Sequence, residues 1–97
     1  MATYVSLLRY TDQGIRNVKE SANRLDAAKK AFQAGGGELK QFYLAMGKYD
    51  IVIVADAPDD ETAARITLGL GSLGNVRTET MRVFTEGEFR KIIGSLK

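Results

Sequence analysis

Apolar and polar residues follow two different spacings along this chain, and the spacings predict its elements. The first segment, Ala2–Tyr10, is rich in aromatic and aliphatic residues, is typical of a strand, and ends at Thr11-Asp12-Gln13-Gly14. Helical spacing follows from about residue 14 to residue 34. The apolar face predicted for this helix consists of Ile15, Val18, Leu25, Ala28 and Phe32. Ser21 is a candidate cap that would restart the helix after a break, and Gly35-Gly36-Gly37 ends it.

The middle of the chain has the pattern of a β-hairpin. Two strand-like segments, Glu38–Met46 and Tyr49–Asp56, are separated by Gly47-Lys48. A two-residue link that begins with glycine is typical of a II′ turn, because glycine accepts the positive φ that this turn requires. The sequence therefore predicts a tight hairpin at Gly47.

A second helix, a fourth strand and a terminal helix complete the predicted order. Pro58-Asp59-Asp60-Glu61 begins the second helix, with proline in the first turn and acids at the positive end of the helix dipole. Its buried stripe is predicted to be Ala63, Ile66, Leu70 and Leu73, with Gly74 at its end. Asn75–Phe84 follows as a strand. Thr85-Glu86-Gly87-Glu88 has the pattern of a capping box and begins a short helix whose apolar residues are Phe89, Ile92, Ile93 and Leu96.

This order predicts the fold class. A β-α-β-β-α-β succession within 97 residues indicates one α+β domain over residues 1–97 with a ferredoxin-like antiparallel sheet. Both crossover helices are expected on one face of that sheet, and the first and third strands at its centre. The terminal helix is an addition to this arrangement.

The two predicted central strands are apolar on both sides. In the first strand Val5 and Leu7 point away from Leu8, and in the third Val52 and Val54 point away from the neighbouring isoleucines. Two helices cover one face only, and soluble monomers rarely expose more than a few hundred Å² of continuous apolar surface. We therefore expect a homodimer whose sheets face one another, most simply with two-fold symmetry.

Composition excludes several kinds of chemistry. The chain has no cysteine and no histidine, so disulfides, iron–sulfur clusters, histidine- or cysteine-ligated metals and Ser-His-Asp catalysis are excluded, and no cofactor is expected. Fourteen basic and twelve acidic residues are dispersed, many at the i, i+4 spacing of surface pairs such as Glu20–Arg24, which disfavours a nucleic-acid partner. No signal peptide or membrane-length apolar run is visible, so a cytoplasmic location is expected.

Two motifs have both a structural and a functional interpretation. Gly69–Gly74 matches the G-x-G-x-x-G pattern, but a helix precedes it and a strand follows, the reverse of a dinucleotide site. Small residues that allow close helix–sheet packing are the better interpretation. In the fourth strand, Arg77 either pairs with Glu79 on a charged edge strand or binds an anion such as a carboxylate.

The tyrosines and one aspartate complete the candidate chemistry. Asp50 begins the most apolar strand, where its carboxylate either caps the hairpin or lies in a cavity as a proton-transfer group. No catalytic spacing surrounds it. The candidate ligand-binding residues are Tyr10, Tyr43, Asp50 and Arg77.

Three segments of the chain resemble the GYD-domain family of small bacterial and archaeal proteins. They are Tyr10-Thr11-Asp12-Gln13-Gly14-Ile15, then Gly47-Lys48-Tyr49-Asp50, then Gly74-Asn75-Val76-Arg77-Thr78-Glu79-Thr80. The resemblance covers nearly the whole chain and implies a dimeric α/β-barrel of ferredoxin-like subunits, but no activity. The chain departs from the family at Ala22, where proline is frequent, which weakens the expected helix restart at Ser21.

Three functions are compatible with the sequence. The first is a homodimeric module that binds a small molecule in a pocket between helices and sheet or at the dimer seam. The second is a cofactor-independent enzyme of the monooxygenase or isomerase kind, with Asp50 or a tyrosine moving the proton. The third is a module that only associates with itself or with other proteins. Wider fold similarity does not choose among them.

Overall fold

Four antiparallel strands form one sheet in the order β2-β3-β1-β4 in the computed structural model, which describes residues 1–97. The strands are β1 (Ala2–Tyr10), β2 (Glu38–Leu44), β3 (Ile51–Ala57) and β4 (Val76–Val83). The first and third strands are therefore central, as predicted. Charged β4 is an edge strand, so its polar residues lie where they also discourage further strand pairing.

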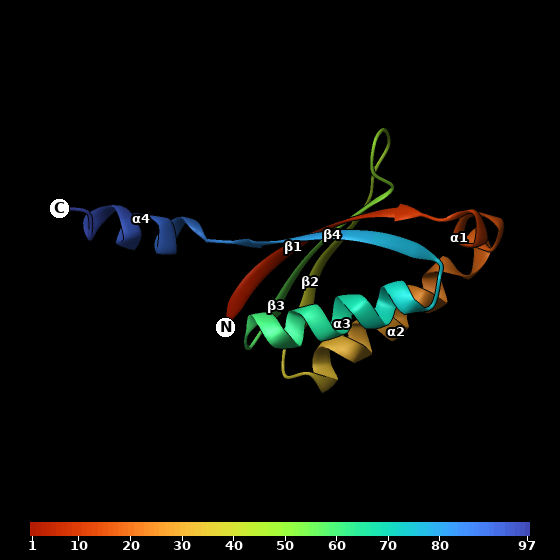
Figure 1. Cartoon of the computed structure of the whole chain (residues 1–97), viewed down its shortest axis with the longest axis horizontal. Helices are drawn as coiled ribbons and strands as arrows, with labels where there is room; N and C mark the ends of the chain where they lie inside the picture. The colour runs from red at the N-terminus through yellow and green to blue at the C-terminus, as the bar shows by residue number, and fades with distance from the viewer.

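Both long helices lie on one face of the sheet (Figure 1). The helical elements are α1 (Asp12–Arg16), the short 3₁₀ helix η1 (Val18–Glu20), α2 (Ser21–Ala34), α3 (Asp60–Ser72) and α4 (Glu86–Gly94). The ferredoxin-like α+β fold predicted from the sequence is thus confirmed. None of these helices has the length and apolar character needed to cross a membrane.

The core fills the space between the sheet and these two helices. Its larger cluster consists of Leu8, Ala28, Phe32, Leu39, Ile51, Ile53 and Ala55, and its smaller one of Ala2, Tyr4, Ala57 and Ala63. Alternation along β1 and β3 places every second residue in this core. We call this side of the sheet the inner face and the opposite side the outer face.

The first helical segment is broken, and this changes its predicted packing. Thr11 caps α1, the chain turns at Asn17, and α2 begins at Ser21. Ser21 does restart the helix, but it is not the cap, because Glu20 occupies that position without a side-chain bond. Since α1 and η1 extend beyond the end of the sheet (Figure 1), Ile15 and Val18 are exposed, contrary to prediction.

The second crossover helix begins later than predicted and is buried over less of its length. Asp59 caps α3 by accepting a hydrogen bond from the Thr62 backbone N–H at 2.8 Å, so Pro58 lies before the first turn. Ala63 is buried as expected, whereas Leu73 is 62% exposed at the far end of the helix. Gly74 then ends the segment with a φ of +84°.

The predicted hairpin has a longer connection than two residues. Strand β2 ends at Leu44 and β3 begins at Ile51, and the intervening loop closes with a 2.8 Å bond from the Ala45 N–H to the Asp50 carbonyl. Gly47 has the predicted positive φ, +113°. The strands stop early because the Tyr49 side chain and the Asp50 carboxylate bond to other strands instead of continuing the hairpin.

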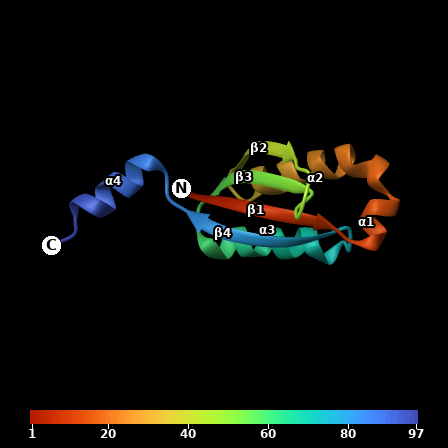
Figure 2. The same cartoon turned by 90° about the horizontal axis from the view of Figure 1, so that it is seen from above.

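Helix α4 extends away from the rest of the molecule. The predicted capping box at Thr85 and Glu88 is present, with both reciprocal bonds formed. Figures 1 and 2 show the helix beyond the end of the sheet, so it covers neither face. Its apolar residues Phe89, Ile92 and Ile93 are between 43% and 54% exposed, and Leu96, which was predicted to belong to this helix, lies beyond its end.

Candidate functional site

The three segments that resemble the GYD family meet at one end of the sheet. The Asp50 carboxylate accepts a hydrogen bond from the Tyr10 backbone N–H at 2.9 Å, which joins the loop before β3 to the end of β1. The Thr11 N–H donates to the Asn75 carbonyl at 3.1 Å, which joins the end of β1 to the start of β4. We call this region the motif corner and define it by residues 10–15, 47–50 and 74–80.

Gly14 allows two of these segments to touch. A Cβ added at Gly14 would lie 1.9 Å from the Asn75 carbonyl oxygen, far inside van der Waals contact. The Gln13 amide, one residue earlier, donates to the Leu73 carbonyl at 3.1 Å and to Asn75 Oδ1 at 3.0 Å. Sequence reasoning missed this role, and its signal was a glycine inside the first turn of a helix, where glycine is otherwise unfavourable.

Gly69 and Gly71 do not have the packing role predicted for them. A Cβ at either position would meet no atom within 4 Å, so close approach to the sheet does not require these two glycines. Both lie in α3, with β4 following, so the helix-before-strand order expected from the sequence is confirmed. The G-x-G-x-x-G match therefore has no phosphate-binding geometry.

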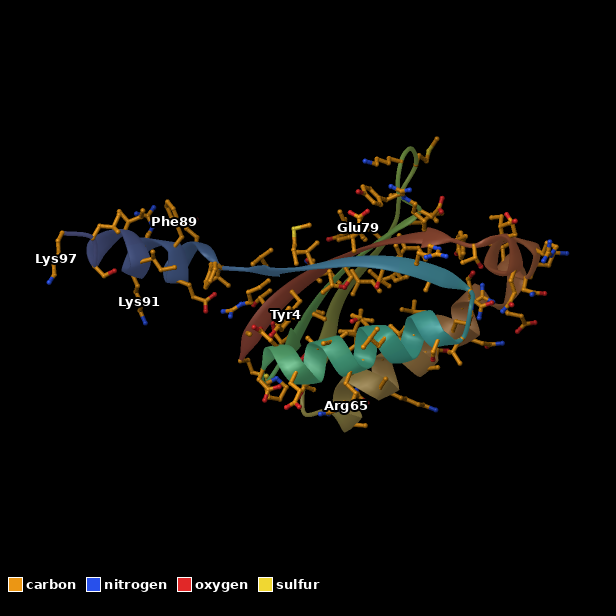
Figure 3. All side chains as sticks on the ribbon, in the orientation of Figure 1. Tyr4, Arg65, Glu79, Phe89, Lys91 and Lys97 are labelled. Carbon is orange, nitrogen blue, oxygen red and sulfur yellow. The ribbon has the colours of Figure 1, made fainter.

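Tyr49 ties the loop before β3 to the outer face of the sheet. Its hydroxyl donates to Glu79 Oε2 at 2.9 Å, and the Arg9 guanidinium lies 5.0 Å from its ring centroid. Arg9 Nη2 also lies 3.9 Å from Glu79 Oε1. Figure 3 shows Glu79 on the side of the sheet away from α3, where the loop rises. The Gly-x-Tyr-Asp segment thus uses Tyr49 to reach β4 and Asp50 to reach β1.

Arg77 lies beside this cluster without a carboxylate partner. It lines a hollow of about 210 Å³ on the outer face, together with Leu7, Arg9, Tyr49, Thr78 and Glu79. The predicted Arg77–Glu79 ion pair is absent, because Glu79 turns to Arg9 and Tyr49. Arg9 and Arg77 are also directly opposite in the strand register, a like-charge pairing that is unfavourable unless an anion lies nearby.

A second cavity lies on the inner face under α2 and the end of α3. Its volume is about 100 Å³ and its lining is mostly apolar, from residues such as Leu8, Leu25 and Ile53. Polar atoms come from Tyr10, Ser21, Arg24 and Asn75. The Tyr10 and Ser21 hydroxyl oxygens are 2.9 Å apart. The cavity therefore has an apolar interior with polar groups beside it.

The four residues predicted to bind a ligand do not converge on one point. Tyr10 lines the inner cavity, Arg77 lines the outer hollow, and Asp50 bonds to backbone between them. Tyr43 is 52% exposed on β2, with two strands separating it from Arg77 in β4. The Asp50 carboxylate thus bonds to the end of β1, outside the hairpin, and lines neither hollow. Arg24, which sequence reasoning assigned to a surface pair with Glu20, lines the cavity instead.

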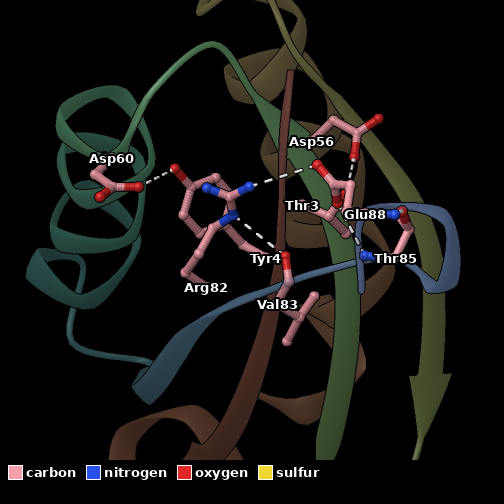
Figure 4. Close-up of polar contacts among 8 residues, drawn as sticks. All are labelled: Thr3, Tyr4, Asp56, Asp60, Arg82, Val83, Thr85 and Glu88. Atoms are coloured by element: carbon pink, nitrogen blue, oxygen red, sulfur yellow. Dashed lines mark hydrogen bonds and ion pairs between the residues drawn. The ribbon is translucent and has the colours of Figure 1, made fainter. Parts of the chain in front are cut away.

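The opposite end of the sheet has a separate set of polar contacts (Figure 4). The Tyr4 hydroxyl donates to the Asp60 carboxylate, and Arg82 lies 3.7 Å from Glu88 at the start of α4. Burial, followed by the bond to Asp60, raises the pKa of Tyr4 to about 12. These contacts fix α3 and the start of α4 to the sheet.

Asp56 carries a third polar contact at this end, on the outer face. It accepts from the Thr3 hydroxyl at 3.2 Å and pairs with the Lys40 ammonium at 3.0 Å. The hydrogen bond from the Lys40 ammonium to Asp56 raises the pKa of Lys40 above its ordinary value. Acidic groups therefore mark one end of the outer face, while Arg9 and Arg77 mark the other.

Between these ends the outer face is apolar and no part of the chain covers it. Its apolar residues are Val5, Leu7, Tyr43, Val52, Val54, Met81 and Val83. Helices α2 and α3 lie on the other face, and α4 extends outward (Figures 1 and 2). Figure 3 shows Phe89 on the same side of the molecule as Glu79, with Lys91 on the opposite side of α4. The apolar stripe of α4 thus faces the same way as the apolar sheet face.

Fold and motif corner together define a ferredoxin-like α+β domain. The GYD domain family model matches residues 4–93, so the chain belongs to the GYD-domain family.

A named protein and a crystal structure, both from Thermus thermophilus, are similar to this chain. The protein is named "Glutamine synthetase and cystathionine beta-lyase binding protein"; it is 32% identical over 82 residues, which cover 84% of this chain and 86% of that protein. The crystal structure of TTHA0845 is 29% identical, with a TM-score of 0.55 over 88% of this chain and 95% of that one.

More distant solved structures share the fold alone. A feast or famine regulatory protein from M. tuberculosis, complexed with L-methionine, is 12% identical, with a TM-score of 0.67 over 88% of this chain and 51% of that one. The hypothetical protein PHS023 from Pyrococcus horikoshii is 20% identical, with a TM-score of 0.55 over 89% of this chain and 93% of that one.

Proposed function

We propose that this chain is a homodimeric module that binds other proteins. The observation that carries the proposal is the apolar outer face, which neither the crossover helices nor α4 covers. Soluble monomers rarely expose an apolar surface that continues over all four strands of a sheet. A second copy of the chain is the partner that this surface fits best.

The charges at the two ends of the outer face support a second copy as that partner. Arg9, Arg77 and Lys48 outnumber Glu79 at the end where β1 finishes. Asp56 and Glu38 outnumber Lys40 at the end where β1 begins. A two-fold axis that inverts the strand direction would place the basic end of one sheet over the acidic end of the other. Opposite charges then meet at the rim of an apolar centre, the usual anatomy of an interface.

Helix α4 supports the same arrangement. A helix of nine residues is marginal in water without packing, and its apolar residues Phe89, Ile92 and Ile93 stay 43% to 54% exposed within their own chain. Because Phe89 faces the same way as the outer face, a second copy seated there can also contact α4. The helix would then lengthen the interface.

The binding of other proteins is proposed from the relative. The Thermus protein is named for binding glutamine synthetase and cystathionine beta-lyase, and it matches this chain over most of both lengths. The inner cavity of about 100 Å³ is smaller than the 300–1,000 Å³ typical of metabolite and drug sites, which favours a protein partner as the main ligand.

The dimer is tested by light scattering with one outer-face variant and one matched control. Wild type is expected at twice the chain mass of 10.6 kDa at micromolar concentration. Val54→Asp places a charge opposite Val5 at the centre of the face and is expected to give a monomer. Leu68→Asp makes the same kind of change on α3, at a residue 74% exposed on the other side, and is expected to remain dimeric.

Two measurements keep this test decisive. Circular dichroism establishes that Val54→Asp is folded, and Arg77→Glu provides a second variant at an exposed position that disturbs charge rather than packing. We expect Arg77→Glu to weaken the dimer, and more strongly at low salt. A wild-type particle of one chain mass at micromolar concentration contradicts the dimer.

Protein binding is tested separately, with purified glutamine synthetase and cystathionine beta-lyase from the organism that encodes this chain. Immobilised wild type is expected to bind at least one of them at micromolar concentration in biolayer interferometry. Failure to bind either enzyme, with an intact dimer, contradicts the proposed partner class and leaves the dimer standing.

Small-molecule binding is a second candidate, favoured by the hollow around Arg77 and by the inner cavity. Of the facing Arg9 and Arg77 guanidinium groups only Arg9 has a carboxylate partner, Glu79, and a ligand anion at the proposed dimer seam would balance Arg77. Tyr43 lies on the same face and would adjoin that seam. An enzyme that uses Asp50 for proton transfer is less well supported, since its carboxylate already accepts the Tyr10 N–H.

A further inference from the structure

We infer that the inner cavity is a binding site for a short aliphatic monocarboxylate, with Arg24 binding the carboxylate. This inference rests on the proposed small-molecule binding and names the ligand class of the inner cavity. It follows from the charge of the lining, the unused donors of Arg24 and the size of the apolar interior.

The cavity has a cation beside it but no acid. Arg24 is its sole charged lining residue, and the remaining polar atoms belong to Tyr10, Ser21 and Asn75. The i, i+4 spacing predicted an ion pair between Glu20 and Arg24. In the structure Glu20 accepts a hydrogen bond from Asn23 at 2.8 Å and forms no salt bridge with Arg24. A half-buried guanidinium without a carboxylate is an unusual arrangement that a bound anion would balance.

Hydrogen bonds hold the Arg24 guanidinium in place but do not use all of its N–H donors. Its Nη1 donates to the Asn17 carbonyl at 3.2 Å, and its Nη2 donates to the Gly14 carbonyl at 3.4 Å and to Ser21 Oγ at 3.1 Å. The guanidinium has more N–H groups than these three bonds use. Contacts to backbone carbonyls fix its direction, and the remaining N–H groups can bind a carboxylate.

Two hydroxyl groups beside Arg24 extend the polar end of the site. Tyr10 Oη and Ser21 Oγ are 2.9 Å apart, and either can donate to the other. Hydroxyl groups rotate to suit a new acceptor, so one of them can turn toward a carboxylate oxygen while Arg24 binds the other. The polar end therefore has donors for both oxygens.

The apolar interior limits the rest of the ligand. Leucine, isoleucine, phenylalanine and alanine side chains surround a volume of about 100 Å³, less than the ~150 Å³ cavity that holds benzene. This volume suits a chain of about three to five carbons. Because no acid lines the cavity, an ammonium group would lose its hydration without a partner, so an amino acid of the same shape fits less well.

The experiment compares three probes of one shape by isothermal titration calorimetry. Isovalerate carries the carboxylate alone, valine adds an ammonium group to the same carbon skeleton, and isopentanol lacks the carboxylate. We expect isovalerate to bind wild type at least tenfold more tightly than either of the others. Equal affinity for all three, or no binding of isovalerate at millimolar concentration, overturns the inference.

Three variants locate the site. Arg24→Gln keeps hydrogen-bond donors but removes the charge and is expected to weaken isovalerate binding at least tenfold. Ala27→Leu, at an exposed position of the lining, is expected to fill the cavity and abolish binding. Arg65→Gln, on the outward side of α3 (Figure 3), is the matched control and is expected to change nothing. Unchanged affinity in Arg24→Gln overturns the inference.

The same samples separate this inference from the wider proposal. Light scattering reports the dimer in every variant, and Arg77→Gln reports on a ligand at the seam. If isovalerate affinity falls in Arg77→Gln and not in Arg24→Gln, small-molecule binding stands and the inner cavity is not its site. If neither variant nor wild type binds the probe while the dimer is intact, both the inner site and this ligand class are refuted.

Discussion

A single added methyl group at Gly14 tests how the motif corner is built. In Gly14→Ala the new Cβ would lie 1.9 Å from the Asn75 carbonyl oxygen, an atom of the backbone that cannot rotate away. The α1 and β4 segments must therefore separate. The contacts at risk are the Thr11 bond to Asn75 and the two Gln13 bonds to Leu73 and Asn75.

The magnitude follows from two opposing effects. Alanine is favoured over glycine within a helix by about 1 kcal/mol. Overpacking costs about 1–3 kcal/mol, and each lost hydrogen bond costs about 0.5–1.5 kcal/mol. With two of these three bonds lost, we expect Gly14→Ala to lower the free energy of unfolding by about 1–5 kcal/mol.

Gly71→Ala is the matched control, because it adds the same methyl group to a helix where no atom lies within 4 Å. Only the higher helix propensity of alanine then acts, and we expect the free energy of unfolding to rise by up to about 1 kcal/mol. Urea unfolding followed by circular dichroism measures the stability of both variants. All samples are kept at one protein concentration, because association would contribute to the apparent stability. A Gly14→Ala stability within about 0.5 kcal/mol of wild type, or the same sign of change in both variants, would refute the close approach.

The remaining predictions concern titration and association. Absorbance at 295 nm should show Tyr4 ionising at about pH 12. The contribution of Tyr4 to stability is complete below pH 10 and is lost as the pH rises toward 12. Asp60→Asn should lower the pKa of Tyr4. The bond from Thr62 lowers the pKa of Asp59, so Asp59→Ala should destabilise the protein at pH 7 but progressively less as pH falls below 4; an equal effect at both pH values would contradict this. Ending the chain at Phe84 removes α4 and should raise the dimer dissociation constant by about tenfold or more in analytical ultracentrifugation; an unchanged constant would place α4 outside the interface.

Periodicity was sufficient to predict the order of the elements and both faces of the sheet. Strands alternate with a period of two whatever they pair with, so Leu8 and Ile53 on one side and Val54 on the other followed from the sequence alone. The cap at Thr85 was also predictable, because its partner Glu88 lies three residues away. Local rules therefore predicted the framework correctly.

The errors came from contacts between distant residues. The hairpin is longer than predicted because Tyr49 reaches Glu79, which is 30 residues further along the chain. Arg24 contacts the carbonyl groups of Gly14 and Asn17, which lie before the break at Ser21, so the spacing within one helix wrongly favoured a surface pair with Glu20. Pairing rules within one helix cannot detect competitors that the fold brings from outside it.

These distant contacts also explain why the family's three motifs are separated in sequence yet act as one unit. Asp50 holds the end of β1, Gly14 and Asn75 join α1 to β4, and Tyr49 links the loop to the outer face. One side of this corner borders the cavity beside Arg24, and the other borders the face proposed for dimerisation. A ligand that moved Tyr10 would thus act, through Asp50 and its neighbour Tyr49, on residues at the dimer seam. With both proposals in place, ligand binding and association would meet at this corner, and by linkage each would change the equilibrium constant of the other by the same factor.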